Sequence, residues 1–388
     1  NYGPAGVSRL GWGEFGDTVS LYRSKIPCSN FAMGRFFGMM GFIATWVVFF
    51  SVSVAAADRA DPYNAYIWNK ANHGDWYEWW YYKVVPPDSP QDAFFFVYGV
   101  VNPWDTARTR PASRSYVTFG SFAENLMVER TLGPADFSAS RDATDVRVGD
   151  AGAATDRALS GRIDGVEWNL TLEHDWKFNA MGWAMFRDWL FNIYWYPAQA
   201  SAFMTGEITV NGRRIQLDHA PAYQDRNWGK SFPVWWTWIV SNHFKNSPGS
   251  VLAVGGGRPE TVGSDRLEGV TIGLRHGGRE YAFRPVDGDI VRVNVRFGHW
   301  EVTARNLFGD EIQISATAPR DKFMDLRFIT PTGAVFHDFE ALRGQVSVKV
   351  LKRGKVIAEL ESDEAGIEYG SADADSFQRL YDADVMLQ

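Results

Sequence analysis

The stretch Asp75–Lys83 combines an acid and a base with a run of tryptophan and tyrosine side chains. In an extended strand alternate side chains share a face, so Glu78 is expected beside the rings of Trp76, Trp80 and Tyr82. An acid on an aromatic face is desolvated, which raises its pKa and keeps a proton available for general acid catalysis. The alternative interpretation is a hydrogen-bonded structural acid near a strand end, because ion-pair networks also bury carboxylates.

The composition describes a globular, aromatic-rich and acidic chain. Its 388 residues allow two or three domains, and 45% hydrophobic with 22% charged residues exclude a disordered chain. Aromatic residues make up 15%, including 17 Trp and 27 Phe, which favours wide apolar cavities or ring-lined surfaces. The formal net charge of −7 and the pI near 5.6 argue against nucleic acid as a partner.

The sequence predicts neither a metal site nor a cofactor. Cys28 is the single cysteine, which excludes an internal disulfide and cysteine-based metal sites. The 7 histidines are scattered and show no spacing typical of metal ligands.

A membrane segment is expected after an N-terminal extension of residues 1–32. Phe36–Ala57 contains 22 residues without a charge. At about 1.5 Å per residue, such a helix crosses a bilayer core of roughly 30 Å, so we expect a transmembrane helix within residues 33–57. The alternative is a cleaved signal peptide that starts at Met33 and ends at Ala55–Ala57.

The charges around this segment set its expected orientation. Basic residues precede it and Asp58 follows it, so the positive-inside rule leaves the N-terminus on the cytoplasmic or stromal side. The large domain then lies on the lumenal or periplasmic side of a single-pass anchor. A secreted or periplasmic protein is the alternative if the segment is cleaved.

Further along, the pattern changes to short strands separated by turn signals. Ala93–Val101 is a continuous apolar run. Ala202–Val210, the dipeptide Asn211-Gly212 and Arg213–Leu217 predict a hairpin with a type I′ turn. Many such runs predict an antiparallel barrel or sandwich. Their number exceeds what one small barrel needs, so we expect two barrel-like halves.

One segment, Asn179–Tyr196, does not fit the strand pattern. It is aromatic almost throughout and ends before Pro197. We interpret it as a short helix that closes a barrel mouth, or as an interfacial element that touches lipid. Packing in a core is the alternative for such an aromatic stripe.

The block Ala222–Pro233 reads AYQDRNWGKSFP, an acid and a base followed by Asn-Trp-Gly and then Phe-Pro. It resembles the signature of the tocopherol cyclase family. Glu78–Lys83 resembles the family's Glu-Gly-Trp-Tyr-Phe-Lys motif, with Trp79 in place of the glycine. The resemblance covers roughly residues 63–370, with these further motifs in the same order: Val101–Pro103, Met181–Trp183, Gly255–Arg258, Glu361–Asp363 and Glu368–Gly370.

The resemblance implies an all-β fold of two lipocalin-like antiparallel β-barrel halves. We expect these halves at residues 62–220 and 221–388, preceded by the one transmembrane helix that the uncharged run predicts. The resemblance also implies a hydrophobic prenylated hydroquinone as ligand and no cofactor. Members of the family close a chromanol ring by protonating a trisubstituted alkene, after which the phenol oxygen adds to the tertiary cation. Such chemistry needs a protonated buried acid, π-faces for the cation and a long apolar cavity.

Carried onto this sequence, the resemblance makes Glu78 and Asp225 the candidates for the proton donor and its partner. Lys83 and Arg226 are candidates for orienting the quinol oxygens, or else they pair with those acids. The remaining candidates for contacting the substrate are Trp80, Tyr82, Asn227, Trp228, Trp235 and Trp236. For each tryptophan, packing in a barrel core is the alternative.

Two departures from the family pattern support a second hypothesis. Where the family carries a Cys-Arg-Asp cluster this chain reads Phe336–Phe339, and a long anchor is not expected in the family. The alternative function is therefore a non-catalytic subunit of a membrane complex that binds lipid, quinone or pigment. Gly34–Met40 is similar to the Gly-Arg and paired-Met pattern of light-harvesting helices, which points to a photosynthetic complex in a plastid thylakoid.

Overall fold

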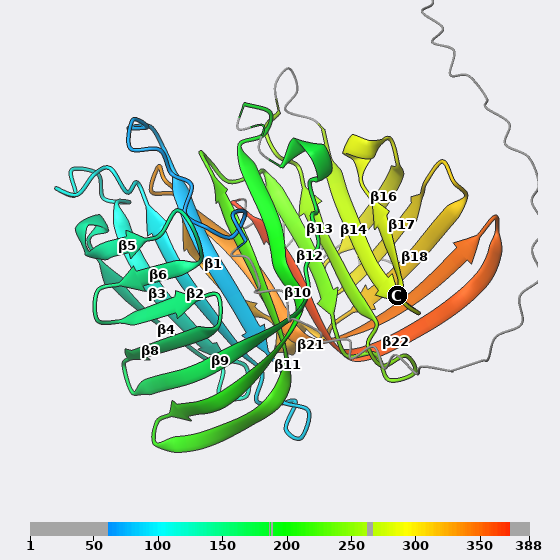
Figure 1. Ribbon diagram of the computed structural model, residues 1–388, viewed down its shortest axis with the longest axis horizontal. Coiled ribbons are helices and arrows are strands. Elements are labelled where there is room, and N and C mark those ends of the chain that lie inside the picture. Colours follow the sequence, from blue (N-terminus) through cyan, green and yellow to red (C-terminus); the bar gives the residue numbers. More distant parts are fainter. Residues whose placement is uncertain (1–60, 186, 188, 262–266, 373–388) are drawn as a thin grey trace, which may run out of the picture. The chain divides into compact units, whose positions relative to one another are not determined.

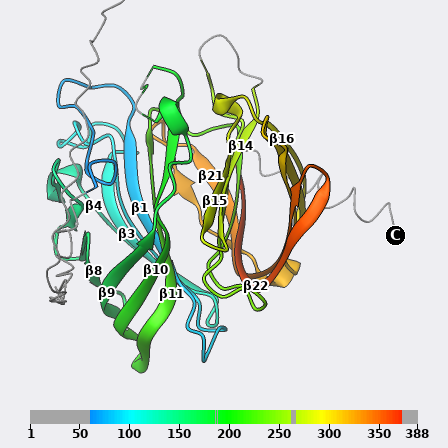
Figure 2. The same ribbon diagram turned by 45° about the vertical axis from the view of Figure 1, so that its right-hand side comes forward.

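The computed structural model describes residues 61–372, apart from 186, 188 and 262–266. These residues form two antiparallel sheets of 11 strands each (Figure 1). One sheet forms a half-barrel and the other nearly closes (Figure 2). The predicted all-β class with two barrel-like halves is therefore confirmed.

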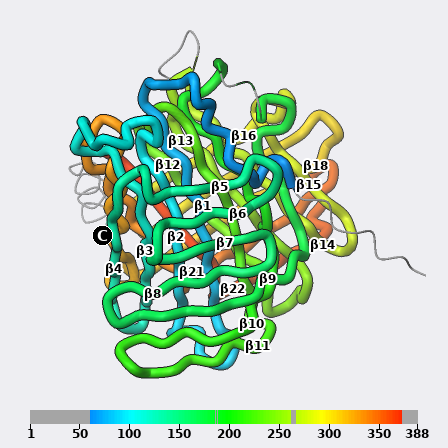
Figure 3. Tube along the Cα trace, turned by 60° about the vertical axis from the view of Figure 1, so that its left-hand side comes forward, coloured from blue at the N-terminus to red at the C-terminus, as the bar shows by residue number. Residues whose placement is uncertain are grey.

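The first sheet has the order β4-β3-β2-β1-β11-β10-β9-β8-β7-β6-β5. Its strands are β1 (Tyr77–Val84), β2 (Phe94–Val101), β3 (Arg114–Ser121), β4 (Leu126–Leu132), β5 (Phe137–Ala139), β6 (Asp145–Val148), β7 (Gly152–Thr155), β8 (Ala158–Ile163), β9 (Val166–Trp176), β10 (Ile193–Val210) and β11 (Arg213–Gly229). The short strands β5–β8 fold back across β2 and β3 (Figure 3), where the Tyr98 hydroxyl donates to the carbonyl oxygen of Ser160 at 3.0 Å.

The second sheet has the order β15-β14-β13-β12-β22-β21-β18-β17-β16, with β19 and β20 also paired to β21. Its strands are β12 (Trp235–Ser241), β13 (Val251–Gly257), β14 (Gly269–His276), β15 (Arg279–Phe283), β16 (Ile290–Arg296), β17 (His299–Arg305), β18 (Asp310–Thr317), β19 (Met324–Asp325), β20 (Phe328–Ile329), β21 (Val335–Lys352) and β22 (Lys355–Ser371). The short 3-10 helices are η1 (Pro134–Asp136), η2 (Gly182–Ala184), η3 (Pro285–Asp287) and η4 (Arg320–Lys322).

Three apolar cores hold the described residues together. One fills the concave side of the first sheet, a second fills the concave side of the second sheet, and a third lies between the two sheets. Strand β1 contributes to two of them, since Trp80 packs in the first core and Trp79 and Tyr81 pack between the sheets.

The burial of both faces explains the sequence pattern of the central strands. All residues of β1 and β2 are buried, as expected from runs without polar alternation. In β17, which has one face exposed to water, exposed or partly exposed residues alternate with buried ones.

Two local predictions can be compared directly with the fold. Val210 pairs with Arg213, and Asn211 and Gly212 both have positive φ, at 50° and 85°, so the type I′ hairpin is confirmed. In the aromatic segment Asn179–Tyr196, η2 is the one short helix among the described residues, and β10 begins at Ile193.

The chain crosses from the first sheet to the second at residues 230–234. The expected boundary between 220 and 221 falls inside β11, whose last residues pair with β1. The acid-and-base motif, expected at the start of the second half, is thus the end of β11, a central strand of the first sheet.

No helix within the described residues is long and apolar enough to cross a membrane. The expected extension of residues 1–32 and the expected span Phe36–Ala57 lie outside the described residues.

The position of β11 generates a test of sheet assembly. A fragment ending at Leu217 lacks residues 222–229, the part of β11 that pairs with all of β1. We expect no cooperative thermal transition from this fragment by circular dichroism, whereas the full chain melts cooperatively under the same conditions. A cooperative melt from the fragment would show that the first sheet forms without its central ladder.

Candidate functional site

A cavity of about 330 Å³ lies between the two sheets. Strands β1, β10 and β11 contribute one wall, and β12, β13, β14 and β22 contribute much of the other. Most of the lining is apolar, and its aromatic members are Trp79, Tyr81, Phe191, Trp195, Trp236, Trp238 and Phe328. Carboxylic acids also reach it, namely Asp225, Glu268, Asp338 and Glu368. An apolar cavity with a few converging polar groups is the usual form of a small-molecule site.

Glycines of β13 make room for the rings of this cavity. A Cβ on Gly255 would lie 2.7 Å from the ring of Trp195, so only glycine allows the indole to lie against the strand. A Cβ on Gly257 would lie 2.0 Å from the carbonyl oxygen of Trp235. The glycines of the motif Gly255–Arg258, noted in the sequence, therefore allow Trp195 and the backbone of Trp235 to pack closely against β13.

Asp225 is a buried acid in the cavity wall. Its Oδ2 atom accepts hydrogen bonds from Trp195 Nε1 at 2.8 Å and from the Tyr223 hydroxyl at 2.9 Å. Its Oδ1 atom has no hydrogen-bond partner among the described residues. Burial raises the pKa of Asp225 to about 7, although both hydrogen bonds act to lower it. This carboxyl therefore exchanges protons near neutral pH.

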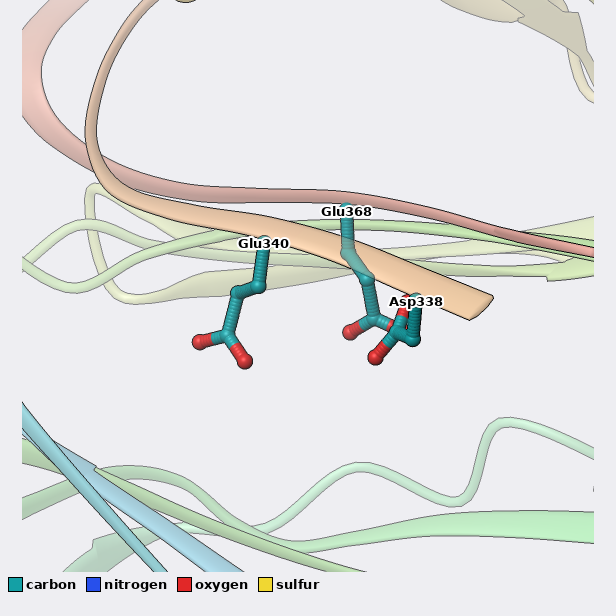
Figure 4. A group of neighbouring side chains, drawn as sticks. All are labelled: Asp338, Glu340 and Glu368. Atoms are coloured by element: carbon teal, nitrogen blue, oxygen red, sulfur yellow. The ribbon is translucent and has the colours of Figure 1, made fainter. Parts of the chain in front are cut away.

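A second group of acids comes from the paired strands β21 and β22 (Figure 4). Glu368 and Asp338 are hydrogen bonded through their carboxyl groups, and Trp236 Nε1 donates to Asp338 at 3.0 Å. Two carboxyl groups bond in this way only when one carries a proton. Burial raises the pKa of both acids well above the ordinary range, and the charge on Asp338 raises that of Glu368 further.

Glu340 completes this group behind the cavity wall. The hydroxyl of Tyr81, which does line the cavity, donates to Glu340. Burial raises the pKa of Glu340 well above the ordinary range, and the neighbouring Glu368 raises it further. Both effects favour the neutral acid.

The same three acids have a spacing that a metal ion would accept, since oxygens of Asp338, Glu340 and Glu368 lie within 4.8 Å of one another. Burying three charges together is unfavourable, and either a cation or protons relieve the repulsion. Burial raises the pKa of all three acids well above the ordinary range, which favours their neutral forms.

Lys83 lies on the face of β1 that points between the sheets, opposite Tyr223 of β11. Its side chain is buried but lies outside the cavity wall. Burial lowers the pKa of Lys83 to about 8, while Glu340 and Glu364 act to raise it. Its expected contact with the quinol oxygens stays a prediction.

Glu78 does not reach this cavity. It accepts hydrogen bonds from the backbone N–H groups of Ile67 and Trp68, at 3.2 and 2.6 Å, and from Trp76 Nε1 at 2.9 Å. It also forms a fully buried ion pair with Arg226. Burial raises the pKa of Glu78, while Arg226 and these donors act to lower it. Its geometry is that of the structural acid that the sequence left as the alternative.

The register of β1 and β11 separates the two acids that were expected to act together. Tyr81 pairs with Asp225, and Glu78 pairs with Trp228. Residues directly opposite each other share a face, and successive residues alternate faces. Asp225 therefore faces the cavity, and Glu78 faces the first core.

The other predicted contacts divide between these environments. Asn227 and Trp236 line the cavity. Arg226 lies in the first core, with its guanidinium 4.8 Å from the ring centre of Trp80 and 4.7 Å from that of Trp228. The remaining two expected contacts lie away from the cavity: Tyr82 packs in the first core and Trp235 in the second.

Several residues of the site were not predicted. Asp338 was noted only as part of a departure from the family pattern, Glu368 only as part of a motif, Trp195 only within the aromatic segment Asn179–Tyr196, and Glu340 not at all. Trp79 and Tyr81 stood in the first motif but on its other face. Because both faces of β1 are buried, its sequence alone could not indicate which face meets a ligand.

A family model described as tocopherol cyclase-like matches residues 175–371, slightly more than half of the 388 residues. The chain belongs to the tocopherol cyclase-like family. The matched region includes Trp195, Asp225, Asp338 and Glu368, so most of the cavity lies within the part that this tocopherol cyclase-like model describes.

Two plant proteins are similar to this member of the tocopherol cyclase-like family. A probable chloroplastic tocopherol cyclase of Oryza sativa subsp. japonica is 29% identical over 189 residues, which cover 46% of this chain and 40% of the rice protein. A chloroplastic tocopherol cyclase of Zea mays is 32% identical over 118 residues, which cover 30% of this chain and 25% of the maize protein. The chain thus matches less than half the length of either relative.

The fold is also similar to a solved structure. The crystal structure of CghA is 12% identical, with a TM-score of 0.50, over 76% of this chain and 88% of CghA. At this identity the likeness describes the fold of the tocopherol cyclase-like family member and nothing of its chemistry.

The buried ion pair gives a test of where Glu78 acts. In Glu78→Gln the guanidinium of Arg226 stays buried without a charged partner, which typically costs about 3–5 kcal/mol of folding free energy. We expect a large fall in the urea midpoint. The matched control is Glu167→Gln, which breaks the exposed pair between Arg162 and Glu167 and should leave the midpoint unchanged. Equal midpoints for wild type and Glu78→Gln would contradict a structural role.

Proposed function

We propose that this chain is a tocopherol-cyclase-type enzyme that closes a prenylated hydroquinone to a chromanol in the cavity between the sheets. The observation that carries the proposal is the hydrogen-bonded acid pair Asp338–Glu368 at an aromatic-lined cavity. Membership of the tocopherol cyclase-like family and the names of the rice and maize relatives support it.

The first step of the proposed reaction is protonation of the alkene. A neutral acid is needed at physiological pH, and burial together with the shared proton keeps the Asp338–Glu368 pair partly protonated. The O–H bond of this acid breaks and a C–H bond forms, which leaves a tertiary cation on the prenyl chain. The faces of Trp79, Trp236 and Phe328 line the same cavity and offer π-electron density to that cation.

The second step is ring closure. The phenol oxygen adds to the cation, and its proton passes to a carboxylate. Asp225 suits this role because its pKa of about 7 leaves a substantial carboxylate fraction at neutral pH and one of its oxygens is free of hydrogen-bond partners among the described residues. One proton is donated and one is taken up, so the reaction is an isomerisation without a co-reactant.

The cavity size sets how the substrate enters. At about 330 Å³ it lies at the small end of ligand sites, which range over roughly 300–1,000 Å³. It suits the quinol ring and the reacting end of the chain. The rest of a long prenyl tail would extend through the mouth.

The location and partners follow as part of the same proposal. Both plant relatives are named as chloroplastic, which supports a plastid for this protein, and the apolar stretch Phe36–Ala57 supports attachment to a membrane there. The non-catalytic alternative, a ligand-binding subunit of a membrane complex, would keep the cavity and use it to hold quinone or lipid.

The proposal is tested by incubating purified protein with a phytylated hydroquinone and detecting the chromanol by mass and ultraviolet spectrum. We expect Glu368→Gln to lower kcat by about two to four orders of magnitude, the usual effect of losing a general acid. The control is Glu280→Gln, because Glu280 also accepts a bond from a tryptophan, Trp176 at 2.7 Å, but lies outside the cavity. Wild-type protein that binds the quinol and forms no chromanol would favour the binding subunit.

The proposed base predicts the pH dependence. Asp225 must be a carboxylate to take the phenol proton, so kcat should rise with pH through about 7 and fall again when the acid pair loses its shared proton. In Asp225→Asn the residual rate should lose the rising limb. A rising limb that survives unchanged in Asp225→Asn would assign the base to another group.

A further inference from the structure

Four exposed apolar side chains lie on segments that also contribute to the cavity wall or are hydrogen bonded to it. Trp183 is 57% exposed, Trp189 60%, Leu267 56% and Val234 42%. We call these four residues the rim. Such side chains are normally covered, and a group of them at one place marks an interaction surface.

Each residue of the rim is tied to the cavity wall. Leu267 itself lines the cavity, and Val234 follows Pro233, which lines it too. Trp189 lies two residues before Phe191 of the wall. A partner that covers the rim therefore lies against the segments that form the cavity wall.

The indole of Trp183 is fixed in its exposed position. Its Nε1 donates to the carbonyl oxygen of Val286, a residue of the cavity wall in η3, at 2.9 Å. Next to it, Arg284 Nε donates to the carbonyl oxygen of Asn179 at 2.7 Å, which joins the segment before η2 to the start of η3. These two hydrogen bonds hold the indole ring in its exposed position.

The charges around the rim have no common sign. Arg187 and Lys230 are exposed cations, and Glu260 and Glu268 are exposed acids, all in the same segments as the rim. This mixture gives no electrostatic preference for an anionic surface. Tryptophan side chains favour the boundary between water and lipid because the ring is apolar and its N–H is polar.

We propose that the rim docks on the surface of a lipid bilayer, so that a prenylated quinol passes from the lipid into the cavity without crossing water. The choice of ligand rests on the proposed function, whereas the docking does not. The sequence outside the described residues agrees with lipid as the occupant, because the uncharged stretch Phe36–Ala57 ends four residues before Asp61. Asp61 in turn accepts a hydrogen bond from Tyr196 of β10 at 2.6 Å.

A second exposed apolar group serves as a matched control. Leu307 and Phe308 are 87% and 80% exposed in the loop between β17 and β18. Lys352 Nζ donates to the carbonyl oxygen of Phe308 at 3.2 Å, and Arg353 is adjacent. This loop is apolar like the rim and has no part in the cavity wall.

The test places one reporter at a time on the full chain. Cys28→Ser removes the single cysteine, and Trp189→Cys, Leu267→Cys or Leu307→Cys then carries a fluorophore. The proteins are reconstituted into phosphatidylcholine vesicles with a quencher attached to the lipid chains. We expect strong quenching at positions 189 and 267, insensitive to salt, and several-fold weaker quenching at 307. Thermal melts of the labelled proteins confirm that each is folded.

Two outcomes would overturn docking through the rim. Quenching at 307 that equals or exceeds that at 189 and 267 would overturn docking through the rim. Labels at 189 and 267 that are immobile yet unquenched would show that protein covers the rim, either residues 36–57 of the same chain or a second copy, and would also overturn it.

A kinetic comparison links the rim to substrate entry. Trp183→Ser with Trp189→Ser should raise KM for quinol presented in vesicles several-fold, with kcat unchanged and with KM unchanged for quinol in detergent micelles. An unchanged KM in vesicles would overturn the passage from lipid to cavity. Failure of the wild type to form chromanol would leave the quenching result intact, so the two proposals fail separately.

Discussion

The architecture depends on one constraint, the burial of β1 on both faces. Because side chains alternate along a strand, even-numbered residues of β1 enter the first core and odd-numbered residues enter the space between the sheets. Because β11 pairs with β1, the residues of β11 divide between the same two environments. On the side of the first core, the pairing of β1 with β11 brings Glu78 and Arg226 together as an ion pair. The two side chains also bind the backbone of Tyr63, Ile67 and Trp68, and so they tie the start of the described chain to the first sheet.

The two sides show how the surroundings of an acid decide its charge. Burial raises the pKa of Glu78 and of Asp225 alike. Glu78 has a guanidinium and three N–H donors against that effect, whereas Asp225 has two donors and no cationic partner within the described part of the chain. Many donors and a cation stabilise the carboxylate, which suits an ionised structural group. An acid with few such partners keeps a raised pKa, which suits a group that exchanges protons. The presence of each acid in a family-like motif therefore does not assign its role.

The sequence predicted what depends on local pattern and missed what depends on sheet register. Asn211-Gly212 and the apolar runs were sufficient for the hairpin and the all-β class, because turn chemistry and periodicity are local. Asp225, Asn227 and Trp236, which were among the expected site residues, line the cavity. Glu78 shares a face with Trp76, Trp80 and Tyr82, as expected, but this face enters the first core, and two buried faces look the same in sequence. Asp338 and Glu368 meet through the pairing of β21 with β22, which no short motif records.

The walls of the cavity come from residues as far apart as Trp79 and Glu368, and this separation has a consequence during synthesis on the ribosome. A chain grows from its N-terminus, so the strands of the first sheet emerge before the acids of β21 and β22 exist. Until those strands pair, the odd face of β1 has no covering sheet, and its rings face water or another molecule. Aggregation in this interval competes with folding, because the apolar residues that meet between the sheets are covered only after the later strands have been made.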